Sequence, residues 1–335
     1  MNVSCLEEGR NLKSRVAIEH SLTKPGAEAI IESIAAGLYS EKKHISCVYL
    51  YDAVGSKLFE KITGLDEYYP ARIEKSLLKD AAIYICDFLR DADIVELGSG
   101  DCSKISILLD AVPSHCLHSL RYIPVDVSHS AIDESARILS GRFPGITING
   151  VIADFMNQLD IVPDGSKRFF CFLGSTIGNL SRTDALDFIT YLGEIMSSGD
   201  MLLLGADMVK DIDMLEKAYN DSQGITAEFN LNILNVVNSL AKTDFVPGKF
   251  EHLAFYNDKL SRIEMHLKAG EDMEIASPLI DENIFIRKGE TIHTENSHKF
   301  TLEHLEGLSL AANLEIEHIF TDENKWFSLV LMSKN

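Results

Sequence analysis

From about residue 94 onward, short apolar runs alternate with helical patterns. The apolar runs are predicted strands, because unbroken hydrophobic positions are typical of strands buried on both faces of a parallel sheet. The segments between them have the apolar spacing of amphipathic helices. This alternation predicts an α/β fold, with a doubly wound parallel sheet covered by helices on both faces. The predicted strands are DIVELG, RYIPVDVS, ITINGVIADF, KRFFCFLGSTIG and DMLLLGADM.

The two flanks of this region break the alternation. Residues 1–25 are polar, and we expect them to be loosely ordered, whereas residues 26–40 have helical periodicity. Residues 211–245 have a helical pattern and residues 250–293 a strand pattern, so this region interrupts the alternation of strands and helices. Residues 314–335 give two more strands, which suit an antiparallel edge of the sheet.

The composition narrows the possible partners and compartments. The 335 residues include 31 Lys and Arg against 51 Asp and Glu, a net charge of −20, so we expect no nucleic-acid partner. The N-terminus lacks the apolar core of a signal peptide, and no apolar run approaches the ~20 residues of a membrane span. Six scattered cysteines without a CxxC pair predict reduced thiols in a cytoplasmic protein. The histidines lack metal-ligand spacing, so we expect no metal site.

The stretch IVELGSGDCSKISILL, residues 94–109, carries the first candidate chemistry. An apolar strand runs into Gly98-Ser99-Gly100, and such a turn lets a ligand approach the backbone closely. A complete dinucleotide fingerprint has a third glycine, but Ser103 stands at that position. The turn therefore does not by itself predict a dinucleotide site.

Acidic residues at neighbouring strand ends suggest another ligand. Glu96 precedes the glycine turn, Asp126 ends the second strand, and Asp154-Phe155 ends the third. A carboxylate at Asp126 can accept both ribose hydroxyls, and Asp154 with Phe155 suits an adenine. An acidic site disfavours a pyrophosphate but suits S-adenosylmethionine, which carries a sulfonium cation and no phosphate. The plain alternative is a tight turn followed by two helix caps.

Longer motifs add a family resemblance. The stretches YDAVGSKLFEKITGLDEYYPARIE, VELGSG-x-x-x-K, FLGSTIGNL, LLLGADMVKD, AYNDSQGITAEFNLNILNVVN, RIEMHL and TENSHKF occur in this order over about residues 35–333. In this combination the chain closely resembles the L-histidine Nα-methyltransferases of the ergothioneine pathway, the EgtD family. The resemblance implies an S-adenosylmethionine-dependent enzyme that transfers three methyl groups to the α-amine of histidine, making hercynine.

The resemblance also implies how the chain is divided. Residues 71–210 and 296–335 would form a class I methyltransferase domain with a Rossmann-like sheet. Residues 1–70 and the insertion 211–295 would form a smaller α+β substrate domain. We expect a monomer whose partner is a small amino-acid substrate.

Carried over position by position, the resemblance implies a set of cofactor-binding residues. Lys104 is expected to reach the methionine carboxylate of the cofactor, where a positive charge is favourable. The full set is Tyr51, Gly98, Lys104, Asp126, Asp154 and Phe155.

The implied amino-acid side lies on other motifs. Asn179 and Tyr219 would hold the substrate carboxylate, and Tyr68 would lie near the reacting amine as the catalytic candidate. Tyr68 and Tyr219 could instead be core residues, and Asn179 could cap a helix. The full set is Tyr68, Gly174, Asn179, Tyr219, Met265, Glu295 and Ser297.

Three of these residues bear on the identity of the acceptor. Glu295 and Ser297 would bind the two imidazole nitrogens, with the carboxylate favouring an N–H or a charged ring. Met265 would supply an apolar wall. Taken singly, Met265 is more typical of a core and Glu295 of a surface, and only their joint match to an imidazole site reverses this interpretation.

Four alternatives stay open at this point. The acceptor could be a tryptophan-type amine, although an indole needs no carboxylate and more volume than Glu295 and Met265 suggest. Methylation of a histidine ring nitrogen is a second alternative. A non-catalytic S-adenosylmethionine-binding regulator is a third, which the intact turn, lysine and acids disfavour. A nicotinamide-dependent oxidoreductase is the weakest, because the third glycine is missing.

Overall fold

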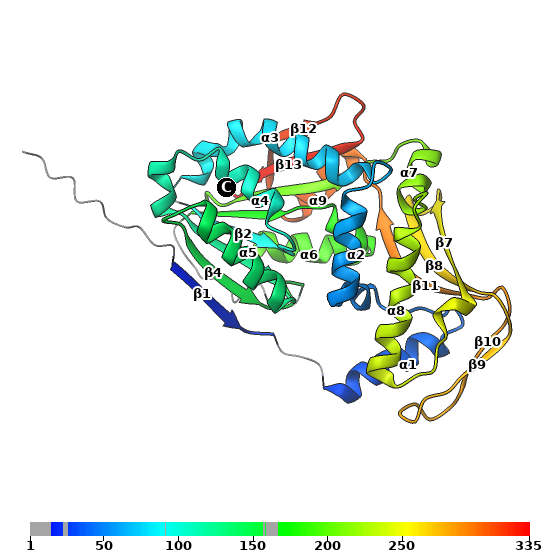
Figure 1. Ribbon diagram of the computed structural model, residues 1–335. Helices are drawn as coiled ribbons and strands as arrows, with labels where there is room; N and C mark the ends of the chain where they lie inside the picture. Colours follow the sequence, from blue (N-terminus) through cyan, green and yellow to red (C-terminus); the bar gives the residue numbers. More distant parts are fainter. Residues whose placement is uncertain (1–14, 23–25, 91, 157, 159–166) are drawn as a thin grey trace, which may run out of the picture.

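A mixed eight-stranded sheet forms the centre of the computed structural model, with the order β1-β4-β3-β2-β5-β6-β13-β12 (Figure 1). The strands from β1 to β6 run parallel, whereas β13 and β12 are antiparallel. The structure describes residues 15–22, 26–90, 92–156, 158 and 167–335. The strands are β1 Arg15–His20, β2 Asp93–Leu97, β3 Arg121–Asp126, β4 Thr147–Ile152, β5 Arg168–Phe172, β6 Met201–Asp207, β12 Glu315–Thr321 and β13 Phe327–Ser333.

Helices cover both faces of this sheet, which confirms the predicted doubly wound architecture (Figure 1). Neighbouring residues of one strand enter opposite cores: Ile94 packs with α3, α4 and α5, whereas Val95 packs with α6 and α9. Both faces are thus apolar, which explains the unbroken hydrophobic runs. The helices are α3 Tyr69–Leu89, α4 Ser103–Asp110, α5 His129–Arg142, α6 Arg182–Ile195 and α9 Leu302–Ala311, with 3-10 turns at Ser114–Ser119 and Thr176–Asn179.

A second, smaller body lies beside the carboxyl end of β6 (Figure 1). Its three-stranded antiparallel sheet, in the order β11-β8-β7, packs with α1, α2 and α8 around a third apolar core. Its helices are α1 Ala27–Tyr39, α2 Ala53–Thr63, α7 Ile212–Tyr219 and α8 Ile225–Ala241, with 3-10 turns at Cys47–Tyr51 and Pro247–Lys249. Its strands are β7 Phe250–Asn257, β8 Arg262–Ala269, β9 Met273–Ile275, β10 Ile284–Ile286 and β11 Thr291–His298.

The N-terminal segment differs from the prediction of loose order. Residues 15–20 form β1, an edge strand parallel to β4. This pairing is non-local, so polar composition alone did not reveal it. The predicted boundary at residue 295 falls inside β11, and the division into domains stays a prediction.

The described ranges contain neither a membrane-spanning helix nor a metal-binding cluster. No helix there is long and apolar enough to cross a membrane. No group of three or more His, Cys, Asp or Glu side chains there could hold a metal ion. Cys47, Cys86, Cys102, Cys116 and Cys171 are free thiols, whereas Cys5 lies outside the described residues.

Candidate active site

The glycine turn connects three strand ends, as the sequence predicts. Gly98 and Gly100 have φ angles of +70° and +46°, which favour glycine because a side chain strains this conformation. A Cβ on Gly98 would lie 3.4 Å from Cε1 of Phe155, and the Gly100 N–H donates to Asp126 Oδ2 at 3.0 Å. The turn thus brings Gly98, Asp126 and Phe155 together beside the exposed Gly100.

The two acids after β3 and β4 have different local roles. Asp126 accepts hydrogen bonds from Gly100 and, at 2.9 Å, from the Ser128 N–H, while burial raises the pKa of its carboxyl. Ser128, and not Asp126, caps α5. Asp154 Oδ1 accepts from the Met156 N–H at 3.0 Å and so stabilises the turn after β4. The roles of both acids toward a nucleoside stay predictions.

Lys104 lies at the carboxyl end of β5 together with a partner that the sequence analysis missed. Its Nζ is 3.2 Å from Glu74 Oε2, and Glu74 Oε1 accepts from the Gly174 N–H at 2.6 Å. Gly174 has a φ of +80°, and a Cβ there would lie 2.6 Å from Lys104 Nζ. Gly174 thus leaves room for the lysine. The one sequence signal for Glu74 is that an acid stands among the apolar positions that form the buried face of α3.

Alternate residues at the end of β11 form the second half of the site. Side chains two positions apart lie on the same face of a strand, so Glu295, Ser297 and Lys299 are expected to be neighbours. The register of β11 with β8 places Met265 opposite Glu295, and Met265 is only 1 % exposed. Thr294 belongs to the other face, where its hydroxyl donates to Asn230 at 2.6 Å.

Glu295 is a buried carboxyl with two donors from distant segments. It is 6 % exposed, and its Oε1 accepts from the Tyr51 hydroxyl at 3.2 Å and from Asn179 Nδ2 at 3.5 Å. Burial raises its pKa to about 7, although the Tyr51 bond and the charge of Lys299 counteract that shift. Tyr51 thus contacts the amino-acid side, and its predicted cofactor role stays a prediction. The interpretation of Asn179 as a helix cap is wrong, because Ser181 caps α6.

A compact hydrogen-bond cluster surrounds Ser297. The Tyr219 hydroxyl donates to Ser297 Oγ at 2.7 Å. Lys299 Nζ donates to Ser297 Oγ at 2.8 Å and to the Tyr219 oxygen at 3.2 Å, and it lies 2.7 Å from Asp207 Oδ2. The hydroxyl proton of Tyr219 is donated to Ser297 in this structure. The predicted hydrogen bond from Tyr219 to a substrate carboxylate therefore stays a prediction.

Asp207 anchors this cluster from the end of β6. Its two oxygens accept from the Tyr69 hydroxyl at 2.9 and 2.8 Å, and Oδ1 also pairs with Lys210. The two lysines hold the pKa of the Asp207 carboxyl below its usual value despite burial. The sequence analysis assigned no role to Tyr69, Asp207, Lys210 or Lys299. Two sequence signals could have found these charged residues. In LLLGADMVKD, charges follow directly after an apolar strand, and in TENSHKF every second residue, Glu295, Ser297 and Lys299, is polar.

Tyr68 lies where the two bodies meet, at the residue that precedes α3. Its ring centroid is 6.1 Å from that of Tyr219 and 6.2 Å from that of Phe59, both edge-on. Burial raises the pKa of the Tyr68 phenol well above 10, so the hydroxyl keeps its proton. Tyr51 and Phe229 extend this aromatic group around Phe59, at 5.6 and 5.9 Å between centroids.

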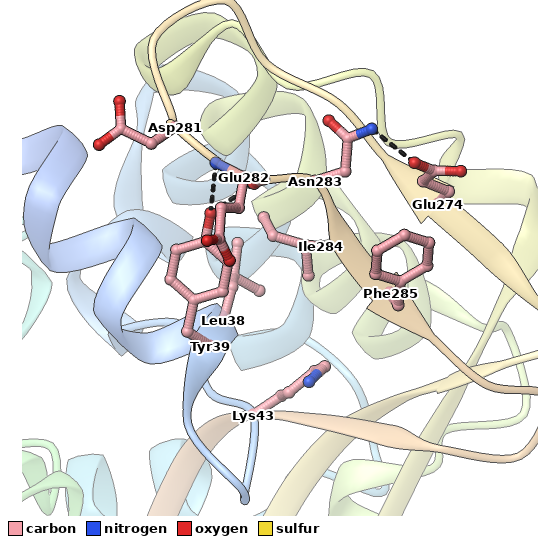
Figure 2. Close-up of a pocket in the computed structure, with 9 residues that line it drawn as sticks. All are labelled: Leu38, Tyr39, Lys43, Glu274, Asp281, Glu282, Asn283, Ile284 and Phe285. Carbon is pink, nitrogen blue, oxygen red and sulfur yellow. Dashed lines mark hydrogen bonds between the residues drawn. The ribbon is translucent and has the colours of Figure 1, made fainter.

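A separate pocket of about 670 Å³ lies between the end of α1 and the β9–β10 hairpin. Figure 2 shows Tyr39 within hydrogen-bond reach of the Glu282 backbone, and the Glu282 N–H donates to its hydroxyl at 3.1 Å. None of the predicted site residues lines this pocket. The candidate active site is therefore the pair of clusters around Lys104 and Glu295.

Comparisons with known proteins show the family to which the chain belongs. Residues 30–334 match the family model described as histidine-specific methyltransferase, SAM-dependent. The chain is 38 % identical over 321 residues to the histidine N-alpha-methyltransferase of Mycobacterium tuberculosis, covering 96 % of this chain and 100 % of that one. It is 39 % identical over 305 residues to the same-named protein of Mycolicibacterium smegmatis, covering 91 % and 95 %.

A more distant relative is a fungal protein. The chain is 29 % identical over 302 residues to ergothioneine biosynthesis protein 1 of Neurospora crassa, which covers 88 % of this chain but 33 % of the fungal protein. The family model spans nearly the whole chain and includes the strand ends, β11 and every residue of the two clusters. This chain therefore belongs to the family of S-adenosylmethionine-dependent, histidine-specific methyltransferases.

Proposed function

We propose that this protein transfers methyl groups from S-adenosylmethionine to the α-amine of L-histidine, up to the trimethylated product hercynine, in ergothioneine biosynthesis. The observation that carries the proposal is the buried Glu295 carboxyl beside Ser297, opposite Met265. An imidazole has two ring nitrogens that need polar partners and an apolar ring edge that needs none. The names of the bacterial and fungal relatives support the same acceptor and pathway.

The residues around the glycine turn fit the proposed cofactor. Gly98 and Gly100 leave backbone accessible, and Lys104 lies at the nearby Gly174 with a partly exposed ammonium that suits a carboxylate. Asp126 is proposed to accept hydrogen bonds from the ribose hydroxyls, and Phe155 to contact one face of the adenine. When bound, S-adenosylmethionine supplies an electrophilic methyl group attached to a sulfonium sulfur.

The amino-acid side then has three tasks. Glu295 and Ser297 bind the imidazole nitrogens, and Met265 packs against the ring. Asn179 Nδ2 carries two protons and donates one to Glu295, so the other is available for the substrate carboxylate. These contacts hold the α-amine toward Tyr68.

Tyr68 is proposed to orient the reacting amine. Because its phenol keeps its proton, it does not act as a strong base, but its oxygen can accept a hydrogen bond from the amine. Such a bond directs the nitrogen lone pair, and positioning of this kind supplies much of the rate enhancement in bimolecular transfers. The rings of Tyr68, Tyr219 and Phe59 also favour the methylated ammonium that accumulates, through cation–π attraction.

A tryptophan-type acceptor fits less well. An indole has a single ring N–H, so either Glu295 or Ser297 would lose its partner in a buried place, which costs free energy. The indole is also larger than an imidazole, and Met265, which would form the apolar wall, is already buried. Histidine therefore remains the proposed acceptor.

Mass spectrometry tests this function directly. The purified protein is incubated with S-adenosylmethionine and each of the twenty amino acids, and with Nα-methylated histidines. We expect mass gains of one to three methyl groups on histidine, with fragmentation placing them on the α-amine. Methyl groups on the ring, or turnover of another amino acid with histidine inert, would contradict the proposed acceptor.

We further propose that the enzyme acts as a monomer in the cytoplasm. Both clusters are built from one chain: Tyr51, Asn179, Tyr219 and Glu295 need no second copy. The free thiols support a reducing compartment. Light scattering after size-exclusion chromatography measures the mass in solution. A dimeric mass at assay concentration would contradict the proposed monomer.

A further inference from the structure

Lys299 is a buried cation whose donors are all accounted for. Its side chain is 0 % exposed, and its Nζ contacts Asp207 Oδ2 at 2.7 Å, Ser297 Oγ at 2.8 Å and the Tyr219 oxygen at 3.2 Å. An ammonium has three donors and no acceptor. The three contacts therefore occupy all three N–H donors of the ammonium. Lys299 can then act on a ligand only through Ser297 and Tyr219.

These contacts determine which way the Ser297 hydroxyl points. Ser297 Oγ accepts from Lys299 and also from the Tyr219 hydroxyl at 2.7 Å. A hydroxyl oxygen accepts about two hydrogen bonds and donates one. With both acceptor positions filled, Ser297 has only its own proton left to offer a ligand.

Glu295 offers the opposite polarity. Its Oε1 accepts from Tyr51 and Asn179, and an ionised carboxylate keeps further acceptor positions on Oε2. With Glu295 ionised, the pair thus presents one donor and one acceptor. A neutral imidazole has one lone pair and one N–H, whereas an imidazolium has two N–H groups and would leave one facing the Ser297 proton.

We propose that Lys299 is a positioning residue that fixes Ser297 as a hydrogen-bond donor, so that the site selects the neutral imidazole of histidine with its N–H toward Glu295. This inference rests on the proposed function and adds the form of the substrate that binds. The same role accounts for a buried lysine at this place. Without Lys299, the Ser297 hydroxyl would remain but would be free to turn.

Lys210 supplies a matched control. It pairs with the other oxygen of Asp207 and donates to the Tyr69 hydroxyl at 2.7 Å. Its side chain is 3 % exposed, so it is nearly as buried as Lys299. Among the hydrogen bonds of the described residues, Lys210 shares the Asp207 anion with Lys299 but not the Ser297 and Tyr219 hydroxyls.

The first test is ¹⁵N NMR of ring-labelled histidine bound to the full-length protein, with S-adenosylhomocysteine present. At pH about 6.5 the free ring is half protonated. We expect the bound ring to show one protonated and one unprotonated nitrogen. Two protonated nitrogens would overturn the inference and leave the proposed function intact, whereas absence of histidine binding would overturn both.

The second test compares Lys299→Met with Lys210→Met. We expect Lys299→Met to raise KM for histidine roughly tenfold, with a smaller change in kcat, and to increase ring protonation in the bound state. Lys210→Met is expected to change KM less than about twofold, although both variants lose one ion pair of Asp207. Equal effects would show a merely structural role and overturn the inference. If Lys299→Met does not fold, the wild-type spectrum still decides the form of the bound ring.

Discussion

The two halves of the site are built over different distances along the chain. On the cofactor side, Gly98, Gly100 and Lys104 lie in one short stretch, although Gly100 also reaches Asp126 across 26 residues and Gly174 reaches Glu74 across 100. On the amino-acid side, Tyr51 reaches Glu295 across 244 residues and Asn179 reaches it across 116. Tyr219 reaches Ser297 across 78 residues.

This difference affects how each half responds to change. A glycine turn depends on local φ angles, so a substitution there acts mainly on the turn and its ligand. The amino-acid side is a connected network of buried polar groups in which each member satisfies another. Removing one member leaves its partners unpaired in a dry environment, which is costly and non-additive.

The largest expected effect separates the two halves. Glu295→Ala removes the acceptor of Tyr51 and Asn179 and the proposed partner of the imidazole. We expect kcat/KM for histidine to fall at least about 100-fold, with the Kd of S-adenosylmethionine changed less than about twofold. Steady-state kinetics and calorimetry measure the two quantities. Glu251→Ala, an exposed acid on β7, is the control, and a parallel loss of cofactor binding would contradict the separation.

The reciprocal change is Lys104→Met on the cofactor side. Lys104 is partly exposed, so its loss is expected to raise the Kd of S-adenosylmethionine about tenfold, through one missing charge-assisted hydrogen bond. The exposed Lys79→Met on α3 controls for a general loss of positive charge. Unchanged cofactor affinity would remove Lys104 from the proposed site.

A backbone test has a smaller effect. Gly98→Ala places a side chain at φ +70° and 3.4 Å from Phe155, which we expect to cost about 1 kcal/mol and lower Tm by roughly 3 °C. Gly141, inside α5, has nothing within 4 Å of an added Cβ, so Gly141→Ala is expected to stabilise the protein slightly. Thermal unfolding compares the two, and equal Tm shifts would contradict the role of positive φ.

The smallest expected effect depends on pH and concerns Glu96, beneath the glycine turn. Burial raises the pKa of this carboxyl to about 8, although the Tyr122 hydroxyl donates to it. The folded protein therefore binds this proton more tightly than the unfolded chain, so stability falls as pH rises from about 4.5 through 8.

Glu96→Gln removes this dependence. We expect the variant to be more stable than the wild type by on the order of 1 kcal/mol above pH 8, with the difference disappearing near pH 5. Chemical denaturation at several pH values measures it. Glu194→Gln, an exposed acid on α6, is the control, and a difference that grows toward low pH would have the wrong sign.

Much of the architecture could be predicted because it follows from local patterns. The apolar runs predicted β2 to β6, and the final two strands were correctly placed on an antiparallel edge. The strand β1 was missed, because Arg15–His20 mixes polar and apolar residues at the end of a mostly polar segment and pairs with the distant strand β4. Glu74 was missed as well, since its bonds to Lys104 and Gly174 depend on how α3 packs across the sheet.

The sequence by itself determined the glycine turn, the acids at the strand ends and, through long motifs, most candidate residues on both sides. Only the tertiary structure placed Tyr51 on Glu295 and linked Ser297 through Lys299 to Asp207. The physical reason is that backbone conformation and strand burial are encoded in neighbouring residues. The partner of a buried charge is instead chosen by which distant segments the fold brings within hydrogen-bond distance.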